Sequence, residues 1–142
     1  MKNTLRLFAL LALMVPVLQS CGDDDSDGGG SKTKTEYLTS GSWKLTSATL
    51  NGVDMMVLMD DCDKDDFRIF NSDKTGMLDA GATKCDENDP QSEDFTWTFN
   101  DSETELTFDG ETGTIDKLDG STLQVSLSDP DLGLSVVQTF KH

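Results

Sequence analysis

The sequence predicts an all-β fold: an eight-stranded antiparallel up-and-down barrel that follows an N-terminal segment of different composition. From Gly41 onward, short runs of residues alternate between apolar and polar, which is typical of strands with one buried face. Turn residues separate these runs, and helical periodicity is nearly absent. Closing the sheet into a barrel removes its exposed edges, but a two-sheet sandwich uses the same pattern and stays an alternative.

Eight strands are expected along the chain, each from its own alternation. They are residues 42–50, 67–70, 75–79, 93–100, 105–109, 113–118, 121–128 and 134–141. The first presents Trp43 and Leu45 on one face and ends at Asn51-Gly52, a strong signal for a tight hairpin turn. Residues 53–59 are good helix formers that precede an acidic cluster, so a short helix or turn is expected there.

The later strands follow the same rule. The second and third flank a polar turn at residues 71–74, and a long polar loop at residues 80–91 follows them. The fourth is the clearest, since aromatic residues alternate with threonines along it. Asp119-Gly120 indicates a hairpin between the sixth and seventh strands. The apolar residues expected on the inner faces of the last four strands are Leu106, Phe108, Ile115, Leu123, Val125, Leu127, Leu134, Val136 and Phe140.

The N-terminus resembles a bacterial lipoprotein signal. A positively charged start precedes an apolar stretch, and Leu18-Gln19-Ser20-Cys21 resembles the lipobox, which is cut before a cysteine that then carries lipid. The apolar stretch of about a dozen residues contains Pro16 and falls short of the ~20 that cross a bilayer, which disfavours a transmembrane helix. The sequence therefore predicts a signal peptide at residues 1–20 and lipidation at Cys21.

Acidic residues follow Cys21 directly. They resemble the export signal that sends some Gram-negative lipoproteins to the outer face of the outer membrane, and an ordinary solvated linker is the alternative. Residues 21–36 are expected to be a lipidated tether, since residues 23–34 include no apolar side chain to bury. The resemblance implies that lipid on Cys21 anchors the protein in the outer membrane, at the cell surface, with residues 37–142 as one domain.

The charge of the chain excludes some partners. The formal net charge is −16, and loss of Lys2 and Arg6 with the signal peptide lowers it by two, to −18. A domain this acidic is a poor partner for nucleic acid and for anionic membrane surfaces. A monomer is expected.

Cysteine usage agrees with export from the cytoplasm. With Cys21 lipidated, Cys62 and Cys85 form an even pair, which predicts a disulfide in an oxidising compartment. Closing that loop contributes about 3 kcal/mol in the chain-entropy description. Two free thiols are the alternative, and a zinc site is disfavoured because His142 is the only histidine.

The start of the first strand carries a family resemblance. Gly41-Ser42-Trp43 is similar to the GxW signature of lipocalins. The segments that complete the resemblance to the small lipocalin-like domain of bacterial lipoproteins are Trp43-Lys44-Leu45-Thr46, Asn51-Gly52, Asp65-Asp66-Phe67, Phe70-Asn71-Ser72-Asp73 and Phe95-Thr96-Trp97-Thr98-Phe99. It implies a calycin-type barrel with Trp43 packed across its closed end and a basic residue of the last strand, here Lys141, covering that tryptophan. The chain ends at His142, without the helix that follows in ordinary lipocalins, so a smaller barrel is expected.

The barrel interior is the expected site. An eight-stranded barrel is either just filled by its own side chains or holds one small ligand. The residues expected to line or fill it are Trp43, Phe67, Phe95, Trp97, Phe99, Phe108 and Phe140. In one hypothesis the protein carries a small apolar ligand. In the other the barrel is filled, and the protein is a non-enzymatic interaction module that recognises a partner through the loops at residues 80–91 and 129–133.

Metal and catalytic sites are not expected. Asn71, Asp73, Thr75 and Gly76 occupy EF-hand positions, but Ala82 stands where the loop needs glutamate, so a polar hairpin is favoured over calcium binding. The acidic residues around the two cysteines are Asp60, Asp61, Asp63, Asp65, Asp66, Asp86, Glu87 and Asp89; they form either a weak cation site or, more in keeping with their composition, a solvated rim. With one terminal histidine and no phosphate-binding loop, neither an enzyme nor a cofactor is expected.

Overall fold

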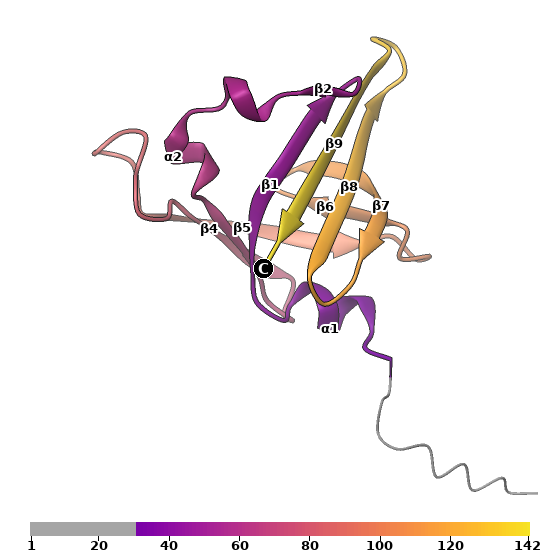
Figure 1. The fold of residues 1–142 in the computed structure, drawn as a ribbon. Coiled ribbons are helices and arrows are strands. Elements are labelled where there is room, and N and C mark those ends of the chain that lie inside the picture. Colours follow the sequence, from indigo (N-terminus) through magenta and orange to yellow (C-terminus); the bar gives the residue numbers. More distant parts are fainter. Residues whose placement is uncertain (1–30) are drawn as a thin grey trace, which may run out of the picture. The chain divides into compact units, whose positions relative to one another are not determined.

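A computed structural model describes residues 31–142; Cys21 and the predicted signal peptide lie outside the described residues. The described chain forms an antiparallel sheet with the strand order β2-β1-β3-β4-β5-β6-β7-β8-β9, and β1 pairs with β9 as well. This last pairing closes all strands except β2 into a ring of eight (Figure 1). The predicted all-β up-and-down barrel is thereby confirmed.

The elements agree closely with the expected ones. The strands are β1 (Ser42–Leu50), β2 (Val53–Asp54), β3 (Phe67–Phe70), β4 (Thr75–Asp79), β5 (Ser92–Phe99), β6 (Glu105–Phe108), β7 (Glu111–Leu118), β8 (Thr122–Asp129) and β9 (Leu134–Lys141). The helices are α1 (Lys34–Leu38), the 3-10 helix η1 (Met56–Leu58) and α2 (Asp61–Lys64). Of residues 31–142, none lies in a helix with the length and hydropathy to cross a membrane.

The extra strand β2 follows from the predicted turn. Asn51 and Gly52 both have positive φ, 49° and 81°, which is the geometry of the tight hairpin turn that favours this pair of residues. The turn folds Val53 and Asp54 back onto the end of β1. The short helix or turn expected at residues 53–59 is the single 3-10 turn η1.

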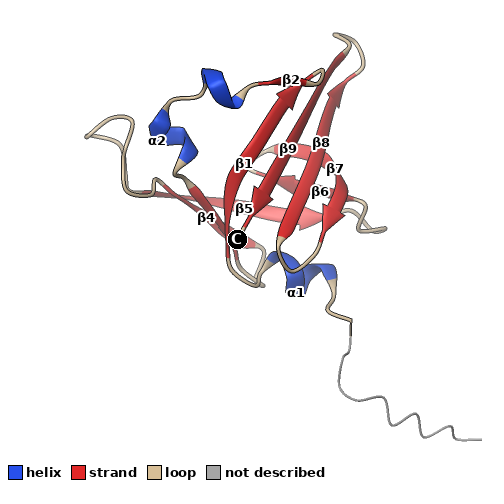
Figure 2. Cartoon of the chain, viewed as in Figure 1, coloured by secondary structure: helices blue, strands red, loops and turns tan. Residues whose placement is uncertain are grey.

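Helix α1 covers the closed end of the barrel, beneath the β7–β8 turn (Figure 2). It begins within the residues predicted as tether, because Thr33 and Glu36 form a capping box that satisfies backbone N–H groups at both positions. Its last residue, Leu38, is fully buried, and the Leu38 carbonyl accepts a hydrogen bond of 2.8 Å from the Trp43 indole. Residues 31–142 accordingly form one compact unit that includes α1.

Aromatic side chains fill the lower half of the barrel. The Phe70 ring lies at its centre and packs edge-on against Phe95, Trp97 and Phe108, with centroid distances of 5.4, 6.0 and 5.8 Å. Edge-to-face pairs of this kind add to the free energy of burial. The buried apolar residues are Leu38, Trp43, Leu45, Ala48, Phe70, Trp97, Leu106, Phe108, Leu123, Val125 and Phe140.

The barrel wall has uneven height at the other end, the mouth. The β6–β7 hairpin turns early, at Asp109-Gly110, and the pair Trp97↔Phe108 is the last between β5 and β6 in that direction. The β8–β9 hairpin continues to the pair Asp129↔Leu134. The upper half of β5 therefore has no neighbour on its β6 side, and the wall is low there.

Candidate functional site

The predicted aromatic set divides into packed core and a few partly exposed rings. Trp43, Trp97, Phe108 and Phe140 are between 0% and 6% exposed, so they fill the barrel. Phe95 and Phe99 are partly buried and pack against this core. Together these six rings fill much of the barrel interior.

Phe67 does not line the interior, contrary to the prediction. In β3 the fully packed residue is Phe70, and side chains alternate between the two faces of a strand. Phe67 therefore lies on the outer face, in register with Lys44, whose Nζ is 5.4 Å from the Phe67 ring centroid. The residue that shares the inner face with Phe70 is Arg68.

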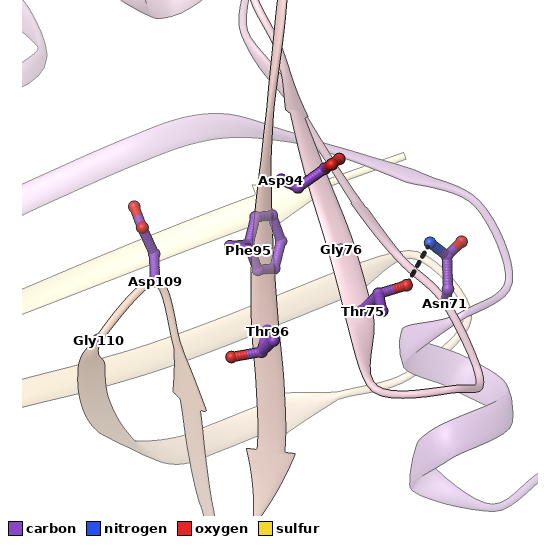
Figure 3. Close-up of a pocket in the computed structure, with 8 residues that line it drawn as sticks. All are labelled: Asn71, Thr75, Gly76, Asp94, Phe95, Thr96, Asp109 and Gly110. Carbon is purple, nitrogen blue, oxygen red and sulfur yellow. Dashed lines mark hydrogen bonds between the residues drawn. The ribbon is translucent and has the colours of Figure 1, made fainter.

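A hollow of about 550 Å³ lies where the wall is low, and we call it the wall hollow. It is lined by Asn71, Thr75, Gly76, Asp94, Phe95, Thr96, Asp109 and Gly110. The Phe95 ring stands at its centre, with Asp109 on one side and Gly76 on the other (Figure 3). Gly76 is required there, because a Cβ atom would overlap the Phe95 ring and come within 2.9 Å of the Ile69 carbonyl oxygen.

A second cavity opens inside the mouth and is called the mouth cavity. It has a volume of about 240 Å³ and is lined by Arg68, Phe108, Asp109, Glu111, Leu127 and Gln138. Beside it lies the hairpin hollow of about 270 Å³, lined by Glu111, Thr112, Leu127, Ser128, Asp129, Leu134 and Val136. The three hollows meet around the short β6–β7 hairpin, since each adjoining pair shares residues of that hairpin.

Arg68 is the residue in this region that sequence reasoning missed. Its guanidinium carbon lies 5.2 Å from the Phe140 ring centroid, and burial lowers the pKa of Arg68, opposed by the charges of Asp66 and Asp109. Within residues 31–142 the only ion pairs are Lys64–Asp61 and Lys117–Asp119, so the guanidinium is in neither. The sequence feature that could have identified Arg68 is its position two residues before Phe70, because residues two apart in a strand lie on the same face.

The disulfide forms as predicted and gathers the acidic residues. Cys62, in α2, is bonded to Cys85 of the long loop, with the two Cα atoms 5.2 Å apart. Asp65 then accepts hydrogen bonds from the backbone N–H groups of Ala82 and Thr83, at 3.0 and 3.1 Å. Burial raises the pKa of Asp66 in this cluster.

Polar side chains in and beside the acidic cluster form hydrogen bonds that hold the long loop. Lys84 Nζ donates to the carbonyls of Glu87 and Asp89, both at 2.8 Å, and Asp86 accepts from the Asn88 N–H. Asp63 lies beside the two cysteine sulfurs, but sulfurs bonded to each other offer no thiolate to a metal.

The turn with EF-hand-like spacing is a polar hairpin. Asp73 Oδ1 accepts hydrogen bonds from the Thr75 N–H and hydroxyl, at 3.0 and 2.6 Å, and these bonds lower the pKa of Asp73. Asn71 also donates to the Thr75 hydroxyl (Figure 3). Strand pairing resumes at Phe70↔Gly76, where a calcium loop would continue.

His142 occupies the place that the resemblance implied for Lys141. Its ring centroid is 3.9 Å from that of Trp43, and both His142 and Lys141 are exposed to solvent. His142 Nδ1 lies 2.9 Å from the Ser42 carbonyl oxygen, and Nε2 lies 3.2 Å from the Ser40 hydroxyl. The single histidine thus packs at the closed end of the barrel, remote from the three hollows.

Comparison with known proteins identifies one match. A family model described as a lipocalin-like domain matches residues 39–125. That range includes the GxW segment, the disulfide and the β6–β7 hairpin. No curated protein and no solved structure matches the chain.

Proposed function

The chain belongs to the lipocalin-like domain family, and from this we propose that it is a lipid-anchored envelope lipoprotein whose barrel mouth binds a small apolar ligand. The observation that carries the proposal is the low wall at the β6–β7 hairpin, where the wall hollow admits a ligand to the Phe95 ring. Pockets that bind small molecules are concave, with apolar walls and a few polar groups that fix orientation. The hairpin hollow has such apolar walls, and the wall hollow presents the Phe95 ring among polar side chains.

The attachment point supports display of the mouth. Helix α1 lies at the closed end of the barrel, so a tether joined to Ser31 leaves the mouth on the opposite side. In this proposal, lipid on Cys21 holds the protein in the outer membrane. Two or three acyl chains make such an anchor stable.

Ligand binding is tested with N-phenyl-1-naphthylamine, a neutral apolar fluorophore. Saturable binding is expected, because burial in an apolar site raises its fluorescence. Leu127→Trp fills the mouth cavity and is expected to abolish binding, whereas the matched control Val137→Trp, on the outer face of β9, retains it. Absence of saturable binding by the unchanged protein would contradict a carrier function.

Anchoring is tested by mass spectrometry of the mature N-terminus and by fractionation. A lipid-modified Cys21 is expected, and Cys21→Ala is expected to move the protein from the membrane to the soluble envelope fraction. Brief protease treatment of intact cells is expected to remove the domain. Recovery of unmodified Cys21 or protection of the domain in intact cells would contradict the anchor or the surface location, respectively.

A second function, the interaction module, is favoured by one observation. Val53, Val57, Leu58 and Leu132 are 66%, 75%, 73% and 69% exposed; they lie in β2, in η1 and in the β8–β9 turn. Val57 and Leu58 are neighbours in η1, and adjoining exposed apolar side chains are a feature of interaction surfaces. If the neutral probe fails to bind while Val57→Ser/Leu58→Ser abolishes capture of an envelope partner, this function replaces the carrier.

A further inference from the structure

The guanidinium of Arg68 is a largely buried cation without a partner among residues 31–142. No side-chain hydrogen bond and no ion pair joins it to another residue of that range, and the guanidinium carbon lies over the Phe140 ring, 5.2 Å from its centroid. Buried charges are ordinarily paired, because leaving water without a partner costs several kcal/mol. An arginine kept in this state inside a cavity is suited to an anion that arrives from outside.

The carboxylates of the region leave this position open. Asp109 and Glu111 line the mouth cavity but belong to the short β6–β7 hairpin, where both are exposed to solvent. The charge of Asp66 raises the pKa of Arg68, but the two side chains form no ion pair. The guanidinium therefore lines a cavity of about 240 Å³ that also includes Asp109 and Glu111, without an ion pair to either carboxylate.

An apolar surface leads from this cation to solvent. Leu127, Leu134 and Val136 line the hairpin hollow, on the part of the β8–β9 hairpin that rises above the low wall. Leu127 and Glu111 belong to both the hairpin hollow and the mouth cavity, so the two spaces adjoin. A ligand that occupies both spaces meets a cation at one end and aliphatic side chains along the rest.

We propose that the ligand is an amphipathic monoanion, with its carboxylate on the guanidinium of Arg68 and a short apolar body along Leu127, Leu134 and Val136. The inference rests on the proposed function, and it adds the class of the ligand and the residue that selects it. Arginine binds a carboxylate through two parallel N–H···O bonds, a geometry that neither an alcohol nor an amine reproduces. Preference for the anion over neutral and cationic molecules of equal length is the signature of this site.

The test uses the full chain carrying Cys21→Ala, so that no attached lipid competes, and three probes of one length: octanoate, octan-1-ol and octylamine. Calorimetric titration is expected to give octanoate at least about ten-fold tighter binding than octanol, the ratio that one charge-assisted pair supplies. Octylamine is expected to bind most weakly. In Arg68→Gln the ratio of octanoate to octanol affinity is expected to fall to about one. Lys117→Gln, the same loss of charge at an exposed residue, is expected to keep the wild-type ratio.

The outcomes separate this inference from the function on which it rests. Octanol binding as tight as octanoate binding overturns the carboxylate assignment and leaves an apolar carrier. An octanoate preference that survives in Arg68→Gln overturns the role of Arg68. Failure of every probe to bind the unchanged protein overturns the carrier function itself. Retained octanol binding by Arg68→Gln shows that this variant folds, so its loss of preference reports on recognition.

Discussion

The imidazole of His142 lies against the indole of Trp43, with ring centroids 3.9 Å apart and ring planes inclined by 34°. Gly41 makes the contact possible, because a Cβ atom there would lie 3.0 Å from two atoms of the imidazole ring. Gly41 and Trp43 of the Gly41-Ser42-Trp43 segment thus both adjoin the ring of His142, the last residue of the chain. Two interactions hold Trp43 in place at the closed end of the barrel: this ring contact and the hydrogen bond that the indole N–H donates to the Leu38 carbonyl.

Removal of the imidazole is expected to loosen the closed end. His142→Ala should lower the free energy of unfolding by about 1 kcal/mol, the scale of an aromatic pair, and should shift tryptophan emission to longer wavelength as water reaches Trp43. Denaturant unfolding followed by fluorescence measures both effects. Lys141→Ala, at the exposed neighbour, is the matched control. Equal effects of the two substitutions would show that stacking on Trp43 contributes nothing.

Gly76→Ala is expected to destabilise the barrel by about 1–3 kcal/mol, because the new methyl group overlaps the Phe95 ring in a packed wall. Gly120→Ala is the control, since a Cβ atom there meets only Tyr37, at 3.9 Å. Thermal unfolding measures the two variants. In Gly76→Ala/Phe95→Ala the two effects should be less than additive, because the overlap is gone. If the effects of the two substitutions on stability simply add, the strain in Gly76→Ala does not come from overlap with the Phe95 ring.

Loss of the disulfide is expected to lower stability without opening the barrel. Cys62→Ser/Cys85→Ser should reduce the free energy of unfolding by about 3 kcal/mol, because the loop across the 23-residue separation is no longer closed in the unfolded chain. The near-ultraviolet circular dichroism of the core tryptophans should persist. Dithiothreitol should shift the denaturation midpoint of the unchanged protein and leave that of the double variant in place. An insensitive wild-type midpoint would contradict the prediction.

Asp119 is expected to make stability depend on acid pH. Hydrogen bonds from the Ser121 backbone, followed by the Lys117 side chain, lower the pKa of Asp119 from 3.8 to about 2. A lowered pKa stabilises the folded state above the unfolded value, so this stabilisation is present above pH 3.8 and is lost as the pH falls through about 2.

The measurement is the difference in unfolding free energy between the unchanged protein and Asp119→Asn. It should be constant near neutral pH and should shrink between pH 3.8 and about 2. Asp101→Asn, at another exposed turn, controls for the general loss of negative charge. A difference between the proteins that stays constant through that window would contradict the assignment.

Arg68→Met is expected to stabilise the unliganded protein. Arg68 is largely buried and has no ion pair within residues 31–142, so replacing its charge with an apolar side chain of similar length removes a desolvation cost and should add about 1 kcal/mol to the free energy of unfolding. Lys117→Met, at an exposed residue, should change it little. A destabilised Arg68→Met would mean that contact with Phe140 outweighs the desolvation cost of Arg68.

Strands and turns were predictable because they depend on neighbours in the sequence. The alternation of Phe95, Trp97 and Phe99 marks β5, and Asn51-Gly52 marks the first hairpin. The disulfide followed from an even pair of cysteines and the expected compartment. Even α1, which was missed, has a local signal, since Thr33 and Glu36 have the spacing of a capping box.

The site was less predictable, as β3 illustrates. Phe67, Ile69 and Phe70 are apolar, so this short strand has no clean alternation, and the aromatic at position 67 was assigned to the interior. The structure puts Phe70 inside because its ring fits among Phe95, Trp97 and Phe108. That choice places Arg68 in the mouth cavity.

The sequence by itself determined the class of fold, the number of ring strands and the pairing of Cys62 with Cys85. These features are predictable because period-two alternation, turn residues and the number of cysteines can be seen in the sequence without knowledge of distant contacts. Only the tertiary structure decided that β1 pairs with β9, that His142 rather than Lys141 covers Trp43, and that the aromatic residues fill the barrel below an arginine. Those outcomes depend on which side chains from distant strands meet once the register is set, and on whether their volumes fill the space between them.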